Sequence, residues 1–600
     1  MIFKYIWVKL NKKPDEAIFL FKNNVKNRET ISFASNYPYE VYLDDNYYSD
    51  GGFRCPDREA YIDTIKDFKG EITIRMHWMN AKSSNIWNRC LFNDPFFAHD
   101  EKTKNWTCEL DSVTMMAKPN SQLPRQNLLI PTGPYAPLML ESVVRNWNLI
   151  PLPILAPKFI PIQLKKFNEQ ILDKLTDNDT VKDLLLFATQ QRPYPMKVVT
   201  YDLGYIALHR FEIENNSNSM IILAYSEVES FDKAWATKNR AKVHLADAST
   251  YNGISRLFGC RGCRYVHVIS SLDNIDYKIN VFRREYPFDW NEFELPREQA
   301  MIIDACKNNL IACTDGGIVD TCWRERAQWV GDARMSIMAL DKLTKNKEIG
   351  QFVLGQISKS YRDGYVSGVT PTKNTKYFCK MPPYHLAFCL TVIESKCSDP
   401  FVTNLVKQSM EYWKENFVGA DGLLTGLTGW NFIDWDFTNR STCGWVDGEQ
   451  GVGIQLPNAV CHAWFLEICD HLKIPHGISM PNFLATFYTG EGFSLLPNTP
   501  SNIHATAAIL SSGLNITESM KESSYKYLNK MRPEFKKCMT PYFAYFVAKA
   551  YMLLNRDLGV KFIEEYYLDI VKKHGTIQEK CNDEASLAHG WSVGIAALLV

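Results

Sequence analysis

The spacing of apolar residues changes near residue 290, and this change constrains the fold more than any other feature of the 600-residue chain. Before it, short runs rich in β-branched and aromatic residues, such as residues 39–43 and 264–269, are separated by Asn, Asp, Gly and Pro. That pattern is typical of β-strands joined by turns. After it, long segments such as residues 326–343, 401–417 and 458–472 repeat their apolar residues at the helical period. The sequence therefore predicts an all-β part followed by an all-α part.

The length of the chain favours several domains, because one hydrophobic core rarely serves 600 residues. A Pro-rich passage at residues 151–161 favours an extended connection between two β-domains. We predict a jelly-roll-like β-sandwich over residues 1–150, a second β-sandwich over residues 151–285, and a helical catalytic domain over residues 286–600.

The helical part contains about twelve segments with helical periodicity. Twelve helices in antiparallel hairpins fit a closed ring, the (α/α)6 barrel, but a solenoid of helical pairs has the same periodicity. Because no repeat of fixed length is visible, the closed barrel is favoured.

Charge and composition exclude several classes of function. Lys plus Arg (67) equals Asp plus Glu (67), so the chain has no basic field that attracts nucleic acid. No apolar run reaches the length of a membrane span, and Lys residues interrupt the first apolar stretch, unlike a secretory signal. We therefore expect the 16 Cys to be reduced thiols and the protein to be cytoplasmic. A homodimer is compatible with the sequence. The lone Cys-x-x-Cys motif, Cys260 to Cys263, lacks two further zinc ligands, so we expect no metal and no cofactor.

The strongest functional signal lies at residues 315–334, in a loop that leads into a helix. Aspartate, glutamate, arginine and tryptophan are concentrated there. Loops on a rigid helical scaffold often hold catalytic groups, and charges at this density are costly to bury for structure alone. A salt-bridge network that joins two helix ends is the structural alternative.

A carboxylate-rich loop of this kind suits the cleavage of a glycosidic bond, which requires one carboxyl group as acid and a second carboxylate on the other side of the sugar. In an inverting enzyme the pair stands roughly 6.5–9.5 Å apart, which favours a second carboxylate from a distant segment. Glu579 near the C-terminus is such a residue, but Asp583 and Glu584 are equally suitable by position.

Four segments in order resemble glycoside hydrolase family 78, the bacterial α-L-rhamnosidases of the six-hairpin glycosidase superfamily. Residues 320–334 are similar to the family signature, and Trp-Asn-Phe-Ile-Asp-Trp at residues 430–435 is similar to its Trp-x-Phe-x-Asp-Trp element. Residues 540–543 follow, and residues 575–592 resemble the family's segment with the general base and the His-x-Trp-Ser after it.

The resemblance implies that Glu325 is the general acid and Glu579 the general base of a hydrolase that releases terminal α-L-rhamnose with inversion. A carbohydrate is the implied partner. The implied substrate-binding residues are Asp320, Arg324, Trp329, Asp332, Trp430, Asp434, Trp435 and His589.

The sequence departs from the family pattern at three places. Cys322 stands where the family often has Pro, Gln578 stands where it usually has Trp, and residues 381–385 differ from its Ile-Pro-Asp-x-Ser element. These departures bear on the identity of the substrate more than on the type of reaction. Two alternatives therefore stay open, a six-hairpin glycosidase that acts on another sugar and a carbohydrate-binding relative without turnover.

Overall fold

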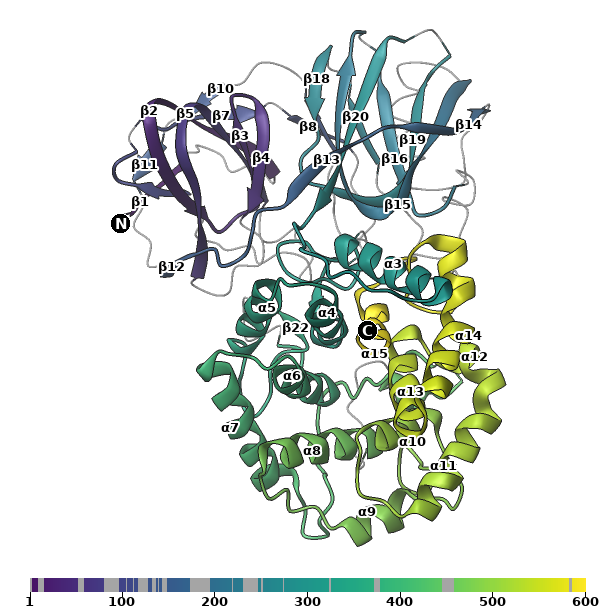
Figure 1. Cartoon of the computed structure of the whole chain (residues 1–600). Helices are drawn as coiled ribbons and strands as arrows, with labels where there is room; N and C mark the ends of the chain where they lie inside the picture. Colours follow the sequence, from purple (N-terminus) through teal and green to yellow (C-terminus); the bar gives the residue numbers. More distant parts are fainter. Residues whose placement is uncertain are drawn as a thin grey trace. The chain divides into compact units, whose positions relative to one another are not determined.

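The chain forms two compact units in a computed structural model (Figure 1). The β-unit comprises Met1–Pro287 with two short segments, Thr314–Gly316 and Thr321–Arg326, and the helical unit comprises the rest. The residues described are 3–8, 16–51, 59–79, 97–103, 105–111, 113–116, 128–131, 136–138, 140–142, 148–172, 195–217, 219–229, 246–249, 252–272, 275–322, 325–371, 378–436, 438–444, 458–581 and 585–600.

Two large sheets form the described part of the β-unit. The first has the order β11-β1-β6-β2-β5-β3-β4, and its strands pair antiparallel except for the β12–β5 pair. Its strands are β1 Phe3–Val8, β2 Glu16–Ser35, β3 Tyr39–Leu43, β4 Asn46–Gly51, β5 Glu59–Met79, β6 Phe97–Asp100, β7 Thr107–Asp111, β10 Ala136–Leu138, β11 Leu140–Ser142 and β12 Asn148–Pro151. The long strands β2 and β5 place alternate apolar side chains in one core, including Phe21, Phe33, Ile72 and Ile74.

The second sheet has the order β13-β20-β15-β19-β16-β17 and is antiparallel. Its strands are β13 Lys158–Ile162, β14 Lys165–Leu172, β15 Met196–Asn215, β16 Ile221–Ser226, β17 Ala246–Ser249, β18 Gly253–Arg256, β19 Arg261–Ser271 and β20 Tyr277–Glu285. A small hairpin pairs β8 Val113–Met116 with β9 Leu128–Pro131. Cys260, directly before β19, and Cys263, within it, are buried free thiols. In the described residues, no group of three or more His, Cys, Asp or Glu is arranged to hold a metal.

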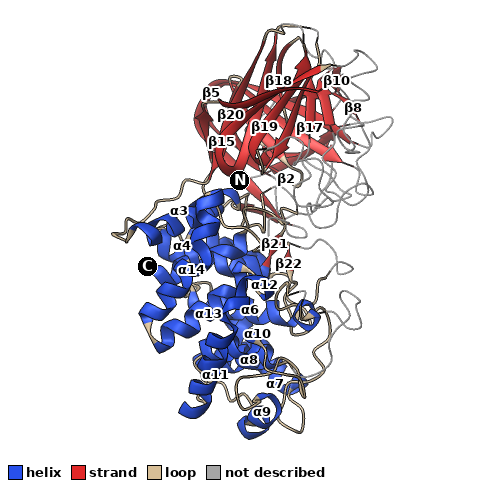
Figure 2. Cartoon of the chain, turned by 90° about the vertical axis from the view of Figure 1, so that its right-hand side faces the viewer, coloured by secondary structure: helices blue, strands red, loops and turns tan. Residues whose placement is uncertain are grey.

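The helical unit begins after the sheets, so the predicted order of an all-β part and an all-α part is confirmed (Figure 2). Its α-helices are α3 Arg297–Ala312, α4 Val330–Leu343, α5 Glu348–Ser358, α6 Pro382–Glu394, α7 Pro400–Phe417, α8 Ala459–Leu472, α9 Met480–Phe487, α10 Ile503–Ser511, α11 Glu518–Met531, α12 Phe535–Cys538, α13 Pro541–Leu554, α14 Arg556–His574 and α15 Ala596–Leu599. Short elements join them, namely β21 Gln328–Trp329, β22 Val369–Thr370 and the 3-10 turns η3 Arg440–Cys443, η4 Arg532–Glu534 and η5 Gly590–Val593. Among the helices described, none is long and apolar enough to cross a membrane.

The most deeply buried helices pack in sequence, α4 on α6, α6 on α8, α8 on α10 and α10 on α13. The helices α7, α11 and α14 bury only part of their surface. Asn458 and Asn502 cap α8 and α10 through their side chains, and proline lies in the first turn of α6 and α13. The segments that lead into these helices carry most of the predicted site residues.

Candidate active site

The loop between α3 and α4 is closed by backbone pairs within the helical unit. Val319 donates its N–H to Cys313 O at 2.8 Å, and Asp320 N–H donates to Ala327 O at 2.9 Å. The Asp320 carboxylate accepts Ala327 N–H at 2.8 Å, so this buried side chain closes its own loop. Asp320 was predicted to bind substrate; its carboxylate bond to Ala327 N–H holds the loop, and contact with substrate stays a prediction.

Trp329 is positioned by the residue before it. The buried amide of Gln328 donates to Gln356 at 3.1 Å and to Thr370 at 3.2 Å, and its oxygen accepts from Ile318 N–H. These bonds fix β21 against β22 and leave the Trp329 side chain half-buried at the start of α4.

The segment that carries Trp430 approaches the backbone before α6 very closely. Trp430 N–H donates to Lys380 O at 2.8 Å, and a Cβ on Gly429 would lie 2.4 Å from the same oxygen. Gly429 has φ +106°, so this position requires glycine for space and for conformation. As a result the rings of Trp430 and Trp329 meet edge to face, with centroids 6.2 Å apart.

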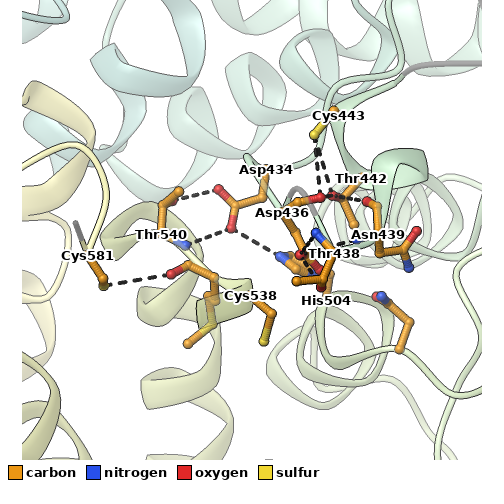
Figure 3. A network of polar contacts seen from close by, with 12 residues as sticks. Asp434, Asp436, Thr438, Asn439, Thr442, Cys443, His504, Cys538, Thr540 and Cys581 are labelled. Atoms are coloured by element: carbon orange, nitrogen blue, oxygen red, sulfur yellow. Dashed lines mark hydrogen bonds and ion pairs between the residues drawn. The ribbon is translucent and has the colours of Figure 1, made fainter. Parts of the chain in front are cut away.

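Asp434 is completely buried and binds two distant segments (Figure 3). Its Oδ1 accepts the Thr540 hydroxyl at 2.6 Å, and its Oδ2 accepts Thr540 N–H and His504 Nε2–H, both at 3.0 Å. The carboxylate therefore joins the segment of Trp435 to the start of α10 and α13. Through these bonds Asp434 positions the neighbouring segments. Its direct contact with substrate stays a prediction.

The C-terminal segment of Glu579 is fixed by Asn309 of α3. The Asn309 amide donates to Ile577 O at 2.7 Å and His589 O at 2.9 Å, and its oxygen accepts Ile577 N–H at 2.9 Å. Glu579 N–H donates to Ser586 O, and Trp591 Nε1 donates to Glu579 O at 3.2 Å. One buried asparagine thus fixes the segment that leads to Glu579 and the turn that begins after His589.

Glu579, His589 and Asp332 form a buried line of ionisable groups. His589 Nδ1 lies 3.2 Å from Asp332 Oδ1, and His589 Nε2 lies 4.0 Å from Glu579 Oε2. Asp332 comes from the first turn of α4, whereas the other two come from the C-terminal segment. A Cβ on Gly590 would lie 2.7 Å from Val319 O, so only glycine allows η5 to approach the loop before α4 this closely.

Aromatic rings lie beside His589 in this line. His589 packs on Trp591 at 4.5 Å, and Trp591 stacks on Tyr542 at 5.5 Å and on Phe432 at 6.3 Å. Phe432 also meets the half-buried Trp435 at 4.8 Å. Acidic oxygens, an imidazole and partly exposed indole faces therefore lie within one cluster of the helical unit.

Solved structures with the same arrangement of elements exist, although no protein-family model and no curated protein matches the sequence. The family 78 rhamnosidase of Bacillus sp. GL1 has a TM-score of 0.75 at 12% identity, covering 99% of this chain and 91% of its own. The chain has the fold of the α-L-rhamnosidases. The Aspergillus terreus α-L-rhamnosidase has a TM-score of 0.69 at 12% identity, and the match covers 99% of this chain and 76% of that chain. The Streptomyces avermitilis α-L-rhamnosidase complexed with L-rhamnose has a TM-score of 0.62 at 12% identity, and the match covers 97% of this chain and 60% of that chain.

Within this rhamnosidase fold, the structure brings Asp332, Glu579 and His589 together and places Trp329, Trp430 and Trp435 in contact with one another or with shared aromatic neighbours. Glu325 is half-buried in the segment Thr321–Arg326 of the β-unit. Arg324 lies outside the described residues, as do Asp583 and Glu584, the rivals of Glu579.

Sequence reasoning missed several residues that build the site. Tyr384 packs against Trp329 at 6.3 Å, and Tyr542 packs against Trp591. Burial, and after it the charge of Asp332, raises the pKa of Tyr384 well above its ordinary value, so this hydroxyl stays protonated. Asn309 could have been found from the sequence, because it is a polar side chain inside an apolar helical pattern. Such a side chain must find hydrogen-bond partners if it is buried.

Proposed function

We propose that the chain is an inverting glycoside hydrolase that releases terminal α-L-rhamnose, with Glu325 as general acid and Glu579 as general base. The observation that carries the proposal is the buried line Glu579–His589–Asp332 beside partly exposed tryptophans, in a chain that has the α-L-rhamnosidase fold. Carboxylates and imidazole accept and donate hydrogen bonds to sugar hydroxyls, and indole faces pack on the C–H faces of a sugar ring.

We also propose that the helical unit is an (α/α)6 barrel. Its inner helices are α4, α6, α8, α10 and α13, with η5 and α15 completing the ring. Their sequential packing and deep burial support this arrangement, as does the contact of η5 with both α4 and α13. The N-terminal ends of the inner helices then share one end of the barrel, where the site residues lie.

In the proposed reaction Glu579 removes a proton from the attacking water while Glu325 protonates the departing glycosidic oxygen. Inversion follows because the water attacks from the face opposite to the leaving group. His589 lies between Glu579 and Asp332, with its two ring nitrogens 4.0 and 3.2 Å from their carboxylate oxygens. Trp329 and Trp435 form apolar surfaces for the sugar, and the L-rhamnose complex of the Streptomyces avermitilis neighbour supports the choice of sugar.

The test is hydrolysis of a panel of 4-nitrophenyl glycosides, followed by proton NMR of the first anomer released from the best substrate. We expect α-L-rhamnoside to be cleaved and the β-anomer of rhamnose to appear first. Cleavage of another glycoside alone would support a six-hairpin glycosidase with a different specificity. No cleavage of any member, with retained sugar binding, would support a binding protein without turnover.

Variants test the two carboxylates. On methyl α-L-rhamnoside, whose alkoxide leaving group must be protonated, Glu325→Gln and Glu579→Gln should each lower kcat by about 10²–10⁴-fold with circular dichroism unchanged, because each loses a proton-transfer group. Asp583→Asn and Glu584→Gln are the matched controls and should keep turnover. Wild-type turnover in Glu579→Gln together with its loss in either control would move the base to the rival residue.

A further inference from the structure

The segment that holds Glu325 is part of the β-unit, although its sequence neighbours on both sides belong to the helical unit. The same is true of Thr314–Gly316, a few residues earlier in the same loop. The groups that fix the position of the proposed acid are therefore to be found among side chains of the β-unit.

The first of these groups is Arg284 near the end of β20. Its guanidinium binds the Asp50 carboxylate of β4 with two hydrogen bonds, at 2.9 and 3.0 Å. Its Nη1 donates to Thr314 O at 3.0 Å and lies 3.6 Å from Asp315 Oδ1. Burial by itself lowers the pKa of Arg284, but Asp50 and Asp315 outweigh it and raise the pKa above its ordinary value. Arg284 thus remains charged and joins both sheets to the loop.

The second group is Arg326, the residue directly after Glu325. Its Nη2 and Nε bind Asp315 Oδ2 at 2.5 and 3.1 Å, and its Nη1 donates to Cys260 O at 3.0 Å. The backbone of Arg326 has φ +49°, a left-handed conformation that non-glycine residues seldom adopt. Such a conformation persists where surrounding contacts over-determine it, and these bonds are contacts of that kind.

The four side chains form a continuous ionic relay, Asp50–Arg284–Asp315–Arg326. Their exposed fractions are 8%, 4%, 5% and 17%, and their formal charges cancel. Removal of one member of such a network costs stability, because a neighbouring buried charge loses part of its compensation. The relay therefore resists displacement of the loop at the residue next to Glu325.

We propose that this relay is a positioning device that fixes the backbone of Glu325 for proton donation. The inference rests on the proposed function for its catalytic half. General acid catalysis requires the proton donor at hydrogen-bond distance from the departing oxygen, and a small displacement of the donor lowers its efficiency steeply. An activated aryl leaving group needs little protonation, whereas an alkoxide leaving group needs it fully. A loosened acid should therefore affect alkyl glycosides more than nitrophenyl glycosides.

The experiment compares Arg326→Met, Arg326→Lys and the control Arg283→Met on 4-nitrophenyl and methyl α-L-rhamnosides. Arg283 lies next to Arg284 on β20, but its guanidinium pairs with Glu285 and not with the loop. Arg326→Met retains the Asp50–Arg284–Asp315 part, so the protein should fold. We expect kcat/KM of Arg326→Met to fall about tenfold more on the methyl than on the nitrophenyl substrate, Arg326→Lys to recover part of this loss, and the control to match wild type.

Amide hydrogen exchange by mass spectrometry supplies a measurement that is independent of activity. In Arg326→Met, exchange should increase in peptides covering residues 317–328 and stay unchanged in the sheets. Equal loss on both substrates together with unchanged exchange overturns the inference. If wild type cleaves neither rhamnoside, the proposed function fails, and exchange alone then decides whether the relay fixes this loop.

Discussion

Replacing Asp434 by alanine is the sharpest test of how the site is built. Three donors aim at this carboxylate, the hydroxyl and N–H of Thr540 and Nε2–H of His504, and all of them are buried. The hydroxyl of Thr540 can rotate toward another acceptor, but the other two donors have fixed directions. Each buried donor left without an acceptor costs about 1–3 kcal/mol, so the two fixed donors should lower the free energy of unfolding of Asp434→Ala by about 2–6 kcal/mol.

The neighbouring Asp436 provides a matched control. Its Oδ1 also accepts three hydrogen bonds, from Thr438 N–H, the Thr438 hydroxyl and Asn439 N–H. Thr438 is exposed, however, so water replaces most of what is lost. Asp436→Ala should therefore cost about 1 kcal/mol or less, although the number of hydrogen bonds is the same.

Urea unfolding followed by tryptophan fluorescence measures the difference, because Trp430 and Trp435 lie in the segment that Asp434 holds. Asp434→Asn should lie between wild type and Asp434→Ala, since an amide oxygen still accepts from the two fixed donors. If Asp434→Ala unfolds at the same urea concentration as Asp436→Ala, the reasoning that burial makes these bonds valuable is refuted.

Three further predictions concern other parts of the chain. Burial raises the pKa of Asp63 on β5 to about 6, so its contribution to stability is full below the unfolded pKa and is lost as pH rises toward 6. In urea unfolding, the free energy of unfolding of Asp63→Asn should therefore rise relative to that of wild type by up to about 3 kcal/mol between pH 4 and pH 7. A difference that stays constant with pH would contradict the assignment. Asn309→Ala, which breaks three bonds, should cost about 3 kcal/mol in the same assay and abolish turnover, whereas Asn308→Ala breaks one bond to Gly575 O and should cost about 1 kcal/mol. Trp435→Ala should raise KM for the rhamnoside about tenfold with a smaller change in kcat, and an unchanged KM would remove Trp435 from the sugar site.

The sequence by itself determined the order of an all-β part and an all-α part, and it was sufficient to recognise the fold. Apolar spacing depends on neighbours a few residues apart, and the chain keeps a strand-like pattern as far as β20 and a helical one from α3 onward. Short motifs are equally local, and the segments around Asp332, Asp434 and Glu579 were sufficient to identify a rhamnosidase fold at 12% identity.

Tertiary structure alone decided what each motif residue touches. Asp434 and Asp332 look alike in the sequence, yet one is saturated by Thr540 and His504 while the other lies beside His589. The assignment of the Glu325 loop to the β-unit, through Arg284 and Arg326, had no signal in the sequence around it. Hydrogen bonds and ion pairs between distant segments depend on how helices and sheets pack, and packing is decided by the whole chain rather than by any window of it.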